Sequence, residues 1–495
     1  MHYYIGTDIG TTSTKSVLFD HQNNVVNSSY QAYPLYNSKP MVAEQDPVEI
    51  YQAVLKTIKE VVQKSMVNPQ DIKFVAFSAA MHSLIPVDRS GSPLMNSMTW
   101  ADTRASVWAN KLKSTKDGMA IYHRTGTPIH PMSPLTKLLW LKAEEKEIFS
   151  KAYKFIGIKE SVFYQLFGEY VIDYSLASAT GMFNLKQLAW DKEVLSLIGI
   201  SEEKLSRVVP TTQVMTDLAL AWTSMLGLHV DTKFIMGASD GVLSNLGLGA
   251  VKKGDVALTI GTSGAIRTVV DQPMTDPEMR TFCYALTEAH WVVGGPVNNG
   301  GIVLKWVRDV LLNNRMSYDE MTALAAKAHP VANGLFFHPY LLGERAPLWN
   351  ADAQGSFFGL GMHHESADLI RASLEGVIFN LYHVLDGLRD VIGDPCEITA
   401  TGGFTRSALW RQILADIFNV EVNFHKSVES SCLGAVVLGK YAIGEATDLL
   451  ALLPDKQSSY RHQPNVDHAE KYTNLIPIYL RLVETFKAGY ATLKK

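Results

Sequence analysis

Length, composition and charge exclude several classes of protein. The chain has 495 residues, of which 47% are hydrophobic and 19% charged, and its formal net charge is −4. These values are typical of a globular protein with two cores of about 250 residues each, and they offer no broad basic surface for a nucleic acid. The three cysteines form neither a disulfide framework nor a metal-ligand pattern. With no signal peptide and no apolar run of about 18 residues, we expect a cytoplasmic protein that is neither exported nor embedded in a membrane.

The chain opens on a predicted β-hairpin over residues 3–20. Two apolar runs flank a turn in which Gly10 would let the backbone approach an oxygen-rich ligand. Asp8, at the end of the first strand, is placed to hold a magnesium ion directly or through water. The turn supplies further donors and a positive charge from Thr11, Thr12, Ser13 and Lys15. This pattern predicts phosphate binding, although the hairpin alone is also compatible with a polar turn carrying an incidental acid.

The next segments predict a helix and a buried strand. Asp46-Pro47 is a good helix start, and apolar residues recur at helical spacing after it. The run FVAFSAAMHS then indicates a strand that ends at Met81 and His82, where an α/β sheet meets its ligands. A loop histidine with a local hydrogen bond is the alternative for His82.

A polar set follows at alternate positions before a helix. Trp100 would stack on carbon, Asp102 would accept hydrogen bonds from hydroxyl groups, and Arg104 would supply a cation, as in polyol sites. The alternative is a helix-terminal acid with an unrelated salt bridge. Other cations that could meet a charged substrate are Arg124, His130, Lys137 and Arg345.

The run FIMGASDG predicts a strand that ends just before a helix. It presents Asp240 near the N-terminus of that helix, which tends to keep a carboxylate ionised. Asp240 is therefore our candidate general base, and a helix N-cap is the alternative interpretation.

A variant of the first hairpin recurs over residues 258–270. Gly261 and Thr262 fall on Gly10 and Thr11, whereas Thr259 stands where the first copy has Asp8. Two related halves, each offering a hydroxyl-rich hairpin to a nucleotide between them, predict an α/β protein of the actin-like or ribonuclease-H-like ATPase architecture. We place the two domains at residues 1–249 and 250–495.

The second half carries two further glycine signals. A helix is expected to begin near Gly300-Gly301, and a loop over residues 336–360 is expected to cover the cleft. Gly402 and Gly403 allow the close approach of a flat ring, so that a base could lie there near Ser407. Tight backbone packing is the alternative for the two glycines.

Seven motifs together carry a resemblance to a known family: DIGTTSTK, AAMHS, W-x-D-x-R, GASDG, TIGTSG, GERAPLW and TGG. In their order and spacing the chain resembles the FGGY carbohydrate kinases over essentially its whole length. Segments such as AEQDP, RTGTPIHPM and GPVNNGG are most similar to the bacterial branch that phosphorylates gluconate. Xylulose kinases usually carry Gln-Met-His-Gly where this chain has Ala-Met-His-Ser at residues 80–83, and glycerol kinases carry an Arg-Glu pair there.

The resemblance implies transfer of phosphate from ATP, with magnesium, to a hydroxyl of the sugar acid. Asp240 would accept the hydroxyl proton and Asp8 would anchor Mg²⁺. The implied nucleotide site comprises Thr11, Thr12, Ser13, Lys15, Gly261, Thr262, Gly301, Gly402, Gly403 and Ser407. The implied substrate site comprises Met81, His82, Trp100, Asp102, Arg104 and Asp240.

Two alternatives stay open at this point. One is a kinase for another open-chain sugar such as xylulose, and the other is a non-catalytic actin-like ATPase that works as a switch. The expected partner is a small molecule, gluconate or a related sugar acid or polyol, with no nucleic acid and no membrane, and a homodimer is the assembly to be tested.

Overall fold

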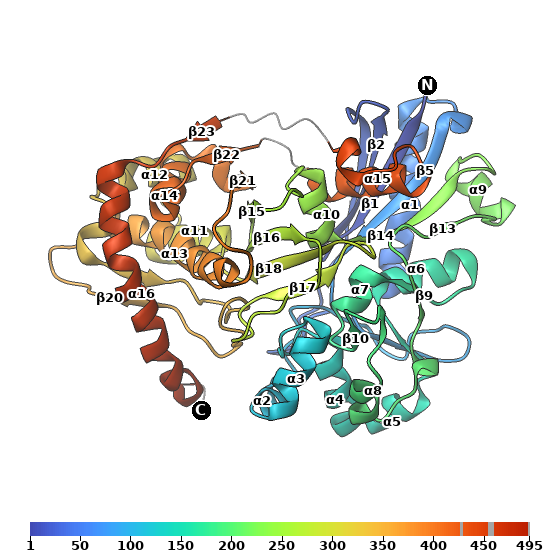
Figure 1. Cartoon of the computed structure of the whole chain (residues 1–495), viewed down its shortest axis with the longest axis horizontal. Helices are drawn as coiled ribbons and strands as arrows, with labels where there is room; N and C mark the ends of the chain where they lie inside the picture. The colour runs from blue at the N-terminus through green and yellow to red at the C-terminus, as the bar shows by residue number, and fades with distance from the viewer. Residues whose placement is uncertain (426–428, 454–459, 494–495) are drawn as a thin grey trace.

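Two β-sheets, each with helices packed around it, form two lobes (Figure 1). The computed structural model describes residues 1–425, 429–453 and 460–493. Within these residues the first sheet has six strands in the order β13-β14-β5-β1-β2-β3, and the second has seven in the order β17-β18-β16-β15-β21-β22-β23.

The elements of the first lobe precede residue 250. Its main sheet contains β1 (Tyr3–Ile9), β2 (Ser13–Asp20), β3 (Val25–Ala32), β5 (Ile72–Ala79), β13 (Val214–Met215) and β14 (Lys233–Ser239). Two-residue and three-residue strands are β4 (Glu44–Gln45), β6 (Ile85–Val87), β7 (Ser97–Met98), β8 (Lys154–Ile156), β9 (Val171–Asp173), β10 (Phe183–Asn184), β11 (Ala189–Trp190) and β12 (Arg207–Val209). The helices are α1 (Pro47–Ser65), α2 (Ser106–Lys113), α3 (Lys116–Thr125), α4 (Pro134–Glu144), α5 (Lys146–Lys151), α6 (Ile158–Phe167), α7 (Tyr174–Ser178), α8 (Lys192–Ile198), α9 (Leu220–Leu226) and α10 (Asp240–Gly247), with 3₁₀ turns η1 (Pro69–Asp71) and η2 (Glu202–Lys204).

The remaining elements follow residue 250. The second sheet contains β15 (Asp255–Ile260), β16 (Gly264–Val270), β17 (Phe282–Ala285), β18 (Trp291–Val297), β21 (Glu397–Thr401), β22 (Val422–Phe424) and β23 (Tyr460–His462), and β19 (Phe336–His338) pairs with β20 (Ser356–Phe358). The helices are α11 (Gly301–Trp306), α12 (Tyr318–Ala325), α13 (Ser366–Ile392), α14 (Ala408–Phe418), α15 (Ser430–Ala442) and α16 (Val466–Leu493), with a π-helical turn η3 (Val307–Leu311) and 3₁₀ turns η4 (Ala332–Gly334), η5 (Gly403–Arg406) and η6 (Leu449–Leu452).

The two sheets repeat one strand order, which confirms the two related halves. In the first lobe β3, β2 and β1 are antiparallel neighbours, and β5 and β14 then join in parallel. In the second lobe β18, β16 and β15 are antiparallel, and β21 and β22 join in parallel. Each predicted hairpin is present: β1 pairs with β2 and β15 with β16. The α/β fold of the actin-like ATPases is therefore confirmed.

A local capping signal determines where α1 begins. The side chain of Asp46 accepts a hydrogen bond from the backbone N–H of Val48, so α1 begins at Pro47 as expected. The apolar face of α1 is buried through Ile50, Val54 and Ile58.

None of the helices in the described ranges combines the length and apolar character that crossing a membrane requires.

One helix departs from the predicted domain boundary at 249/250. That boundary separates the two sheets, but α15 packs on the first lobe, beside β1, β5 and α10 (Figure 1). Its backbone comes so close that a Cβ on Gly6 would lie 2.2 Å from the carbonyl oxygen of Cys432, and one on Gly434 would lie 2.0 Å from that of Leu243. The second half of the chain thus completes the first lobe.

Candidate active site

The carboxylates expected to do the chemistry lie at adjacent strand ends. Asp8 on β1 is paired in register with Ser78 on β5, whose hydroxyl donates a 2.6 Å hydrogen bond to the carboxylate of Asp8. The neighbouring strand β14 ends at Ser239, paired with Ala79 on β5, and Asp240 follows as the first residue of α10. Parallel strands thus bring Asp8 and Asp240 to one edge of the sheet, where such folds bind ligands.

Asp240 has a pKa raised to about 6, mainly by burial and next by the negative charge of Asp8. The nearby guanidinium groups of Arg267 and Arg345 and a 2.6 Å hydrogen bond from the N–H of Gly241 act in the opposite direction. The helix N-terminus tends to favour the ionised form, as the sequence indicates, but desolvation acts the other way and is the largest influence on this pKa. Asp240 is not an N-cap either, since Ser239 occupies that position.

The pKa of Asp8 is also raised, and desolvation is again the largest cause. The described residues contain no group of three or more histidine, cysteine or acidic side chains that could hold a metal ion by themselves. Mg²⁺ usually binds through one or two carboxylates and completes its shell with water and substrate phosphates. Two partly buried carboxylates at one edge of the sheet fit such an ion, whose positive charge would offset the repulsion that Asp8 exerts on Asp240.

Met81 and His82 follow β5 into the same region. His82 is buried with φ at 71°, a conformation that residues other than glycine seldom adopt and that concentrates at functional sites. Its Nδ1 donates a 2.8 Å hydrogen bond to the carbonyl of Ala179, and burial lowers its pKa to about 3, so the ring is neutral. The terminal methyl of Met81 lies over Gly241, next to Asp240.

Trp100 lies between the first turn and the second lobe. Its Nε1 donates a 2.9 Å hydrogen bond to the hydroxyl of Thr11, and the guanidinium of Arg345 lies 4.5 Å from the centre of its ring. Arg345 belongs to the loop expected to cover the cleft, and Lys113 of the first lobe donates hydrogen bonds to the carbonyls of Leu348 and Trp349 in that loop. The loop therefore spans the two lobes.

Asp102 and Arg104 require a correction. Asp102 is 0% exposed, and its oxygens accept hydrogen bonds from the N–H of Ala43 and from Arg104. Arg104 is held by Asp102, by Glu44 at 2.5 Å and against the ring of Trp140. These two side chains tie the Trp100 loop to β4, and the interpretation of them as groups that contact a polyol was wrong.

The first turn has its backbone anchored and its hydroxyl groups near the surface. The carbonyl of Thr11 accepts a hydrogen bond from Gln45, that of Thr12 from the N–H of Tyr33, and that of Ser13 from the N–H of Gly10. Lys15, which we expected beside phosphate, forms an ion pair with Glu429, just before α15. A phosphate contact by Lys15 would compete with this ion pair.

The second hairpin borders a cavity of about 530 Å³. Its lining includes four predicted nucleotide residues, Gly261, Gly301, Gly403 and Ser407, and additional residues that the sequence did not indicate, among them Tyr318, Phe404 and Trp410. The turn is fixed to α11, because the carbonyls of Gly261 and Thr262 accept hydrogen bonds from the N–H groups of Gly301 and Ile302. Apolar walls with a few polar groups suit a nucleobase and its sugar.

Gly402 serves packing rather than the cavity. It has φ at 117°, and a Cβ there would lie 2.2 Å from the carbonyl oxygen of Ile260 on β15. Gly403, by contrast, has open space around it and lines the cavity. The two alternatives for this glycine pair are thus divided between its two members.

Sequence reasoning missed Arg267. It lies on β16, and its guanidinium reaches Gly241 beside Asp240. The sequence did contain one indication of a role for Arg267: it is a single charged residue in an otherwise apolar strand. A charge rarely occupies such a position without a partner. Of the other cations considered, Arg124 pairs with Asp191, Lys137 donates to the carbonyls of His82 and Thr99, and His130 is fully enclosed beside Trp349.

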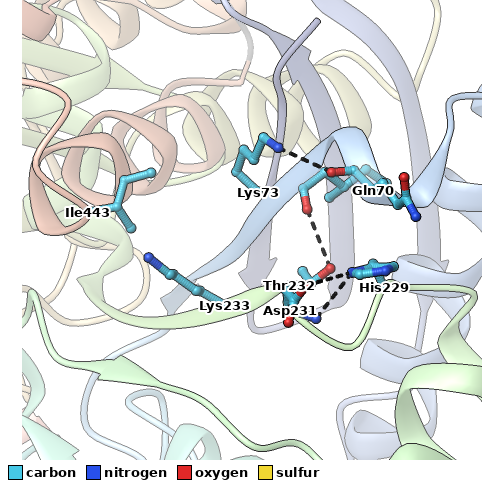
Figure 2. A pocket seen from close by; sticks show the side chains of 8 residues that line it. Gln70, Lys73, His229, Asp231, Thr232, Lys233 and Ile443 are labelled. Carbon is cyan, nitrogen blue, oxygen red and sulfur yellow. Dashed lines mark hydrogen bonds and ion pairs between the residues drawn. The ribbon is translucent and has the colours of Figure 1, made fainter.

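A second cavity, of about 400 Å³, is lined by lysine side chains but lies at the opposite end of the first sheet from the candidate site (Figure 2). Lys73 and Lys233 lie at the beginnings of β5 and β14, whereas the site residues follow the ends of these strands. Figure 2 shows Lys73 turned to the backbone of Gln70 and His229 turned to Asp231. None of the predicted site residues lines it.

Comparisons with known proteins agree along the whole chain. The N-terminal domain of the FGGY family of carbohydrate kinases matches residues 3–247, and the C-terminal domain of that family matches residues 256–443. A gluconokinase of Bacillus subtilis (strain 168) is 51% identical over 99% of this chain and 97% of its own length. A gluconate kinase structure from Lactobacillus acidophilus has a TM-score of 0.95 and 41% identity, with 99% of both chains covered. A ligand-bound xylulose kinase structure from Lactobacillus acidophilus has the same TM-score and identity over 100% of both chains.

Proposed function

Because the chain belongs to the FGGY family of carbohydrate kinases, we propose that it transfers the γ-phosphoryl group of ATP to D-gluconate, giving 6-phosphogluconate and ADP. It is an ATP-dependent carbohydrate kinase. The observation that carries the substrate is the 51% identity to a gluconokinase over 99% of the chain. Matches to kinases over the full length favour this function over a non-catalytic ATPase switch.

In this proposal Asp240 is the general base. The substrate hydroxyl loses its proton to the carboxylate of Asp240 while its oxygen attacks the γ-phosphorus, and the bond to the β-phosphate oxygen breaks to release ADP. A pKa of about 6 suits the task, because the group is mostly ionised at neutral pH and still binds a proton well. Trp100, Met81 and neutral His82 would line the site of the acceptor. Their contribution to the rate would be to position the acceptor hydroxyl, because the protein forms no covalent bond with it.

Asp8 would hold Mg²⁺ together with the nucleotide phosphates. The ion would neutralise charge on the phosphoryl oxygens. Thr11, Thr12 and Ser13 would donate to the phosphates from the first turn, with Thr262 opposite, and Gly261, Gly301, Gly403 and Ser407 would face the rest of the nucleotide in the second lobe. These assignments rest on the placement of the residues at the two hairpins and at the cavity.

Xylulose is the second candidate acceptor. The xylulose kinase structure from Lactobacillus acidophilus matches this chain as well as the gluconate kinase structure does. The 51% identity to a gluconokinase places gluconate first. The two candidates differ in charge, because gluconate carries a carboxylate and xylulose does not.

The test is ADP release by the purified protein with Mg-ATP and a panel of acceptors: gluconate, xylulose, ribulose, glycerol and none. We expect strong turnover with gluconate and only background in the other reactions. Turnover restricted to another polyol would overturn the substrate, and slow hydrolysis independent of any acceptor would overturn the kinase assignment. Light scattering on the same sample tests the expected homodimer, and cell fractionation tests the expected cytoplasmic location.

A further inference from the structure

We propose that Arg267 binds the carboxylate of the substrate and so selects a sugar acid over a neutral sugar. This inference rests on the proposed function, since it concerns the acceptor that Asp240 would activate. It assigns a specific role to a residue on β16, the second strand of the second hairpin, beyond the turn.

Arg267 reaches from one lobe to the other. On β16 it pairs in register with Gly294 of β18, and a Cβ at that glycine would lie 3.1 Å from the Cγ of Arg267, so the missing side chain makes room for the arginine stem. At the far end, an ideal Cβ on Gly241 would lie 3.1 Å from Nη2 of Arg267 and 3.1 Å from Cε of Met81. The guanidinium therefore lies beside the residue that follows Asp240 and beside the residue that precedes His82.

The guanidinium of Arg267 has an unsatisfied donor. Its Nε is buried and has no hydrogen bond to any described residue. Asp240 attracts the guanidinium electrostatically. Because a buried donor of a charged group is costly to leave unpaired, an anionic ligand would satisfy it, and a carboxylate matches the planar fork of donors.

Arg345 is the other arginine near Asp240, but two of its nitrogens already donate to the protein. Its Nε donates to the side chain of Asn298 at 2.7 Å and its Nη2 to the carbonyl of Val297 at 3.3 Å, while its plane lies over Trp100. These contacts hold the guanidinium of Arg345 in place. The Nε of Arg267, by contrast, is buried without an acceptor. An open-chain acid with its hydroxyl end at Asp240 can place its carboxylate against the guanidinium of Arg267.

The test compares Arg267→Met and Arg267→Lys with the unmodified protein. We expect Arg267→Met to raise the KM for gluconate about 10- to 100-fold, as for a lost charge-assisted hydrogen bond, with the KM for ATP changed less than about 2-fold. Arg267→Lys keeps the charge but not the fork, so it should recover part of the loss. Arg207→Met is the matched control, because Arg207 is an exposed arginine on β12 that pairs with Glu169.

Calorimetric binding of gluconate and of glucitol, its neutral analogue, supplies a second readout. The unmodified protein should prefer gluconate, and Arg267→Met should lose that preference. An unchanged KM for gluconate, or an equal loss of both ligands, would overturn the role of Arg267, as would a fall in kcat alone. If the unmodified protein neither binds nor phosphorylates gluconate, the proposed function fails instead, so the two failures are distinguishable.

Discussion

Asp240 combines burial, a neighbouring acid and two nearby arginines, and the balance raises its pKa to about 6. If Asp240 is the base, Asp240→Asn removes the proton acceptor while preserving shape. We expect kcat to fall about 100- to 10,000-fold, with the KM for ATP nearly unchanged because the nucleotide cavity is lined by the second lobe. Steady-state kinetics measure this, and near-normal turnover by the variant would exclude Asp240 as the base.

The same pKa predicts the pH dependence of the reaction. A general base works only when ionised, so kcat/KM for gluconate should be level above about pH 7 and fall below the pKa of about 6, approaching tenfold per pH unit. His82 cannot produce this limb, since its pKa lies near 3. A profile that stays flat down to pH 5 would contradict the raised pKa.

Single residues show where sequence reasoning succeeds and where it fails. Asp8 and Asp240 were found because a strand followed by a polar turn fixes where an acid lies on the sheet. Asp102 was misjudged because its partner Ala43 is distant in sequence, and only the fold shows that Oδ2 accepts from Ala43 while Oδ1 accepts from the N–H of Arg104. Arg267 was missed because its place in the candidate site depends on its contact with Gly241 in the other lobe, which the sequence does not show.

At the scale of elements, the two hairpins and α1 followed from local patterns, but the position of α15 did not. Nothing in the local sequence of α15 indicates that it returns to the first sheet. The glycines of α15 and α10 are the structural reason for this packing, since Gly434 and Gly247 let the two backbones meet. Small residues at a helix contact indicate close approach but not the identity of the partner.

This contact gives a prediction about stability. Gly434→Ala should destabilise the protein by about 1–3 kcal/mol, because the new methyl group would meet the Leu243 carbonyl, at 2.0 Å before relaxation. Thermal unfolding measures the shift. Gly489→Ala is the matched control in α16, where a Cβ meets nothing within 4 Å, so its midpoint should stay level or rise. Equal midpoints for the two variants would contradict the tight α10–α15 contact.

At the scale of the whole molecule, the proposed acceptor site lies where the two lobes meet. Met81, His82 and Asp240 belong to the first lobe and Arg267 to the second, whereas the cavity for the nucleotide is lined by elements of the second lobe. Transfer requires the lobes to bring both ligands together and to exclude water, which would otherwise accept the phosphoryl group. The loop carrying Arg345, which contacts Trp100, is the element placed to respond to both ligands.

Hydrogen exchange read by mass spectrometry tests which parts of each lobe the two ligands contact. ADP alone should slow exchange in α12 and η5 at the cavity, and gluconate alone should slow it after β5 and along β16. Both ligands together should add protection in the loop over residues 339–355, because that loop contacts the first lobe through Trp100 and Lys113. Protection of that loop by ADP alone, to the same extent as by both ligands, would mean that the acceptor plays no part in joining the lobes.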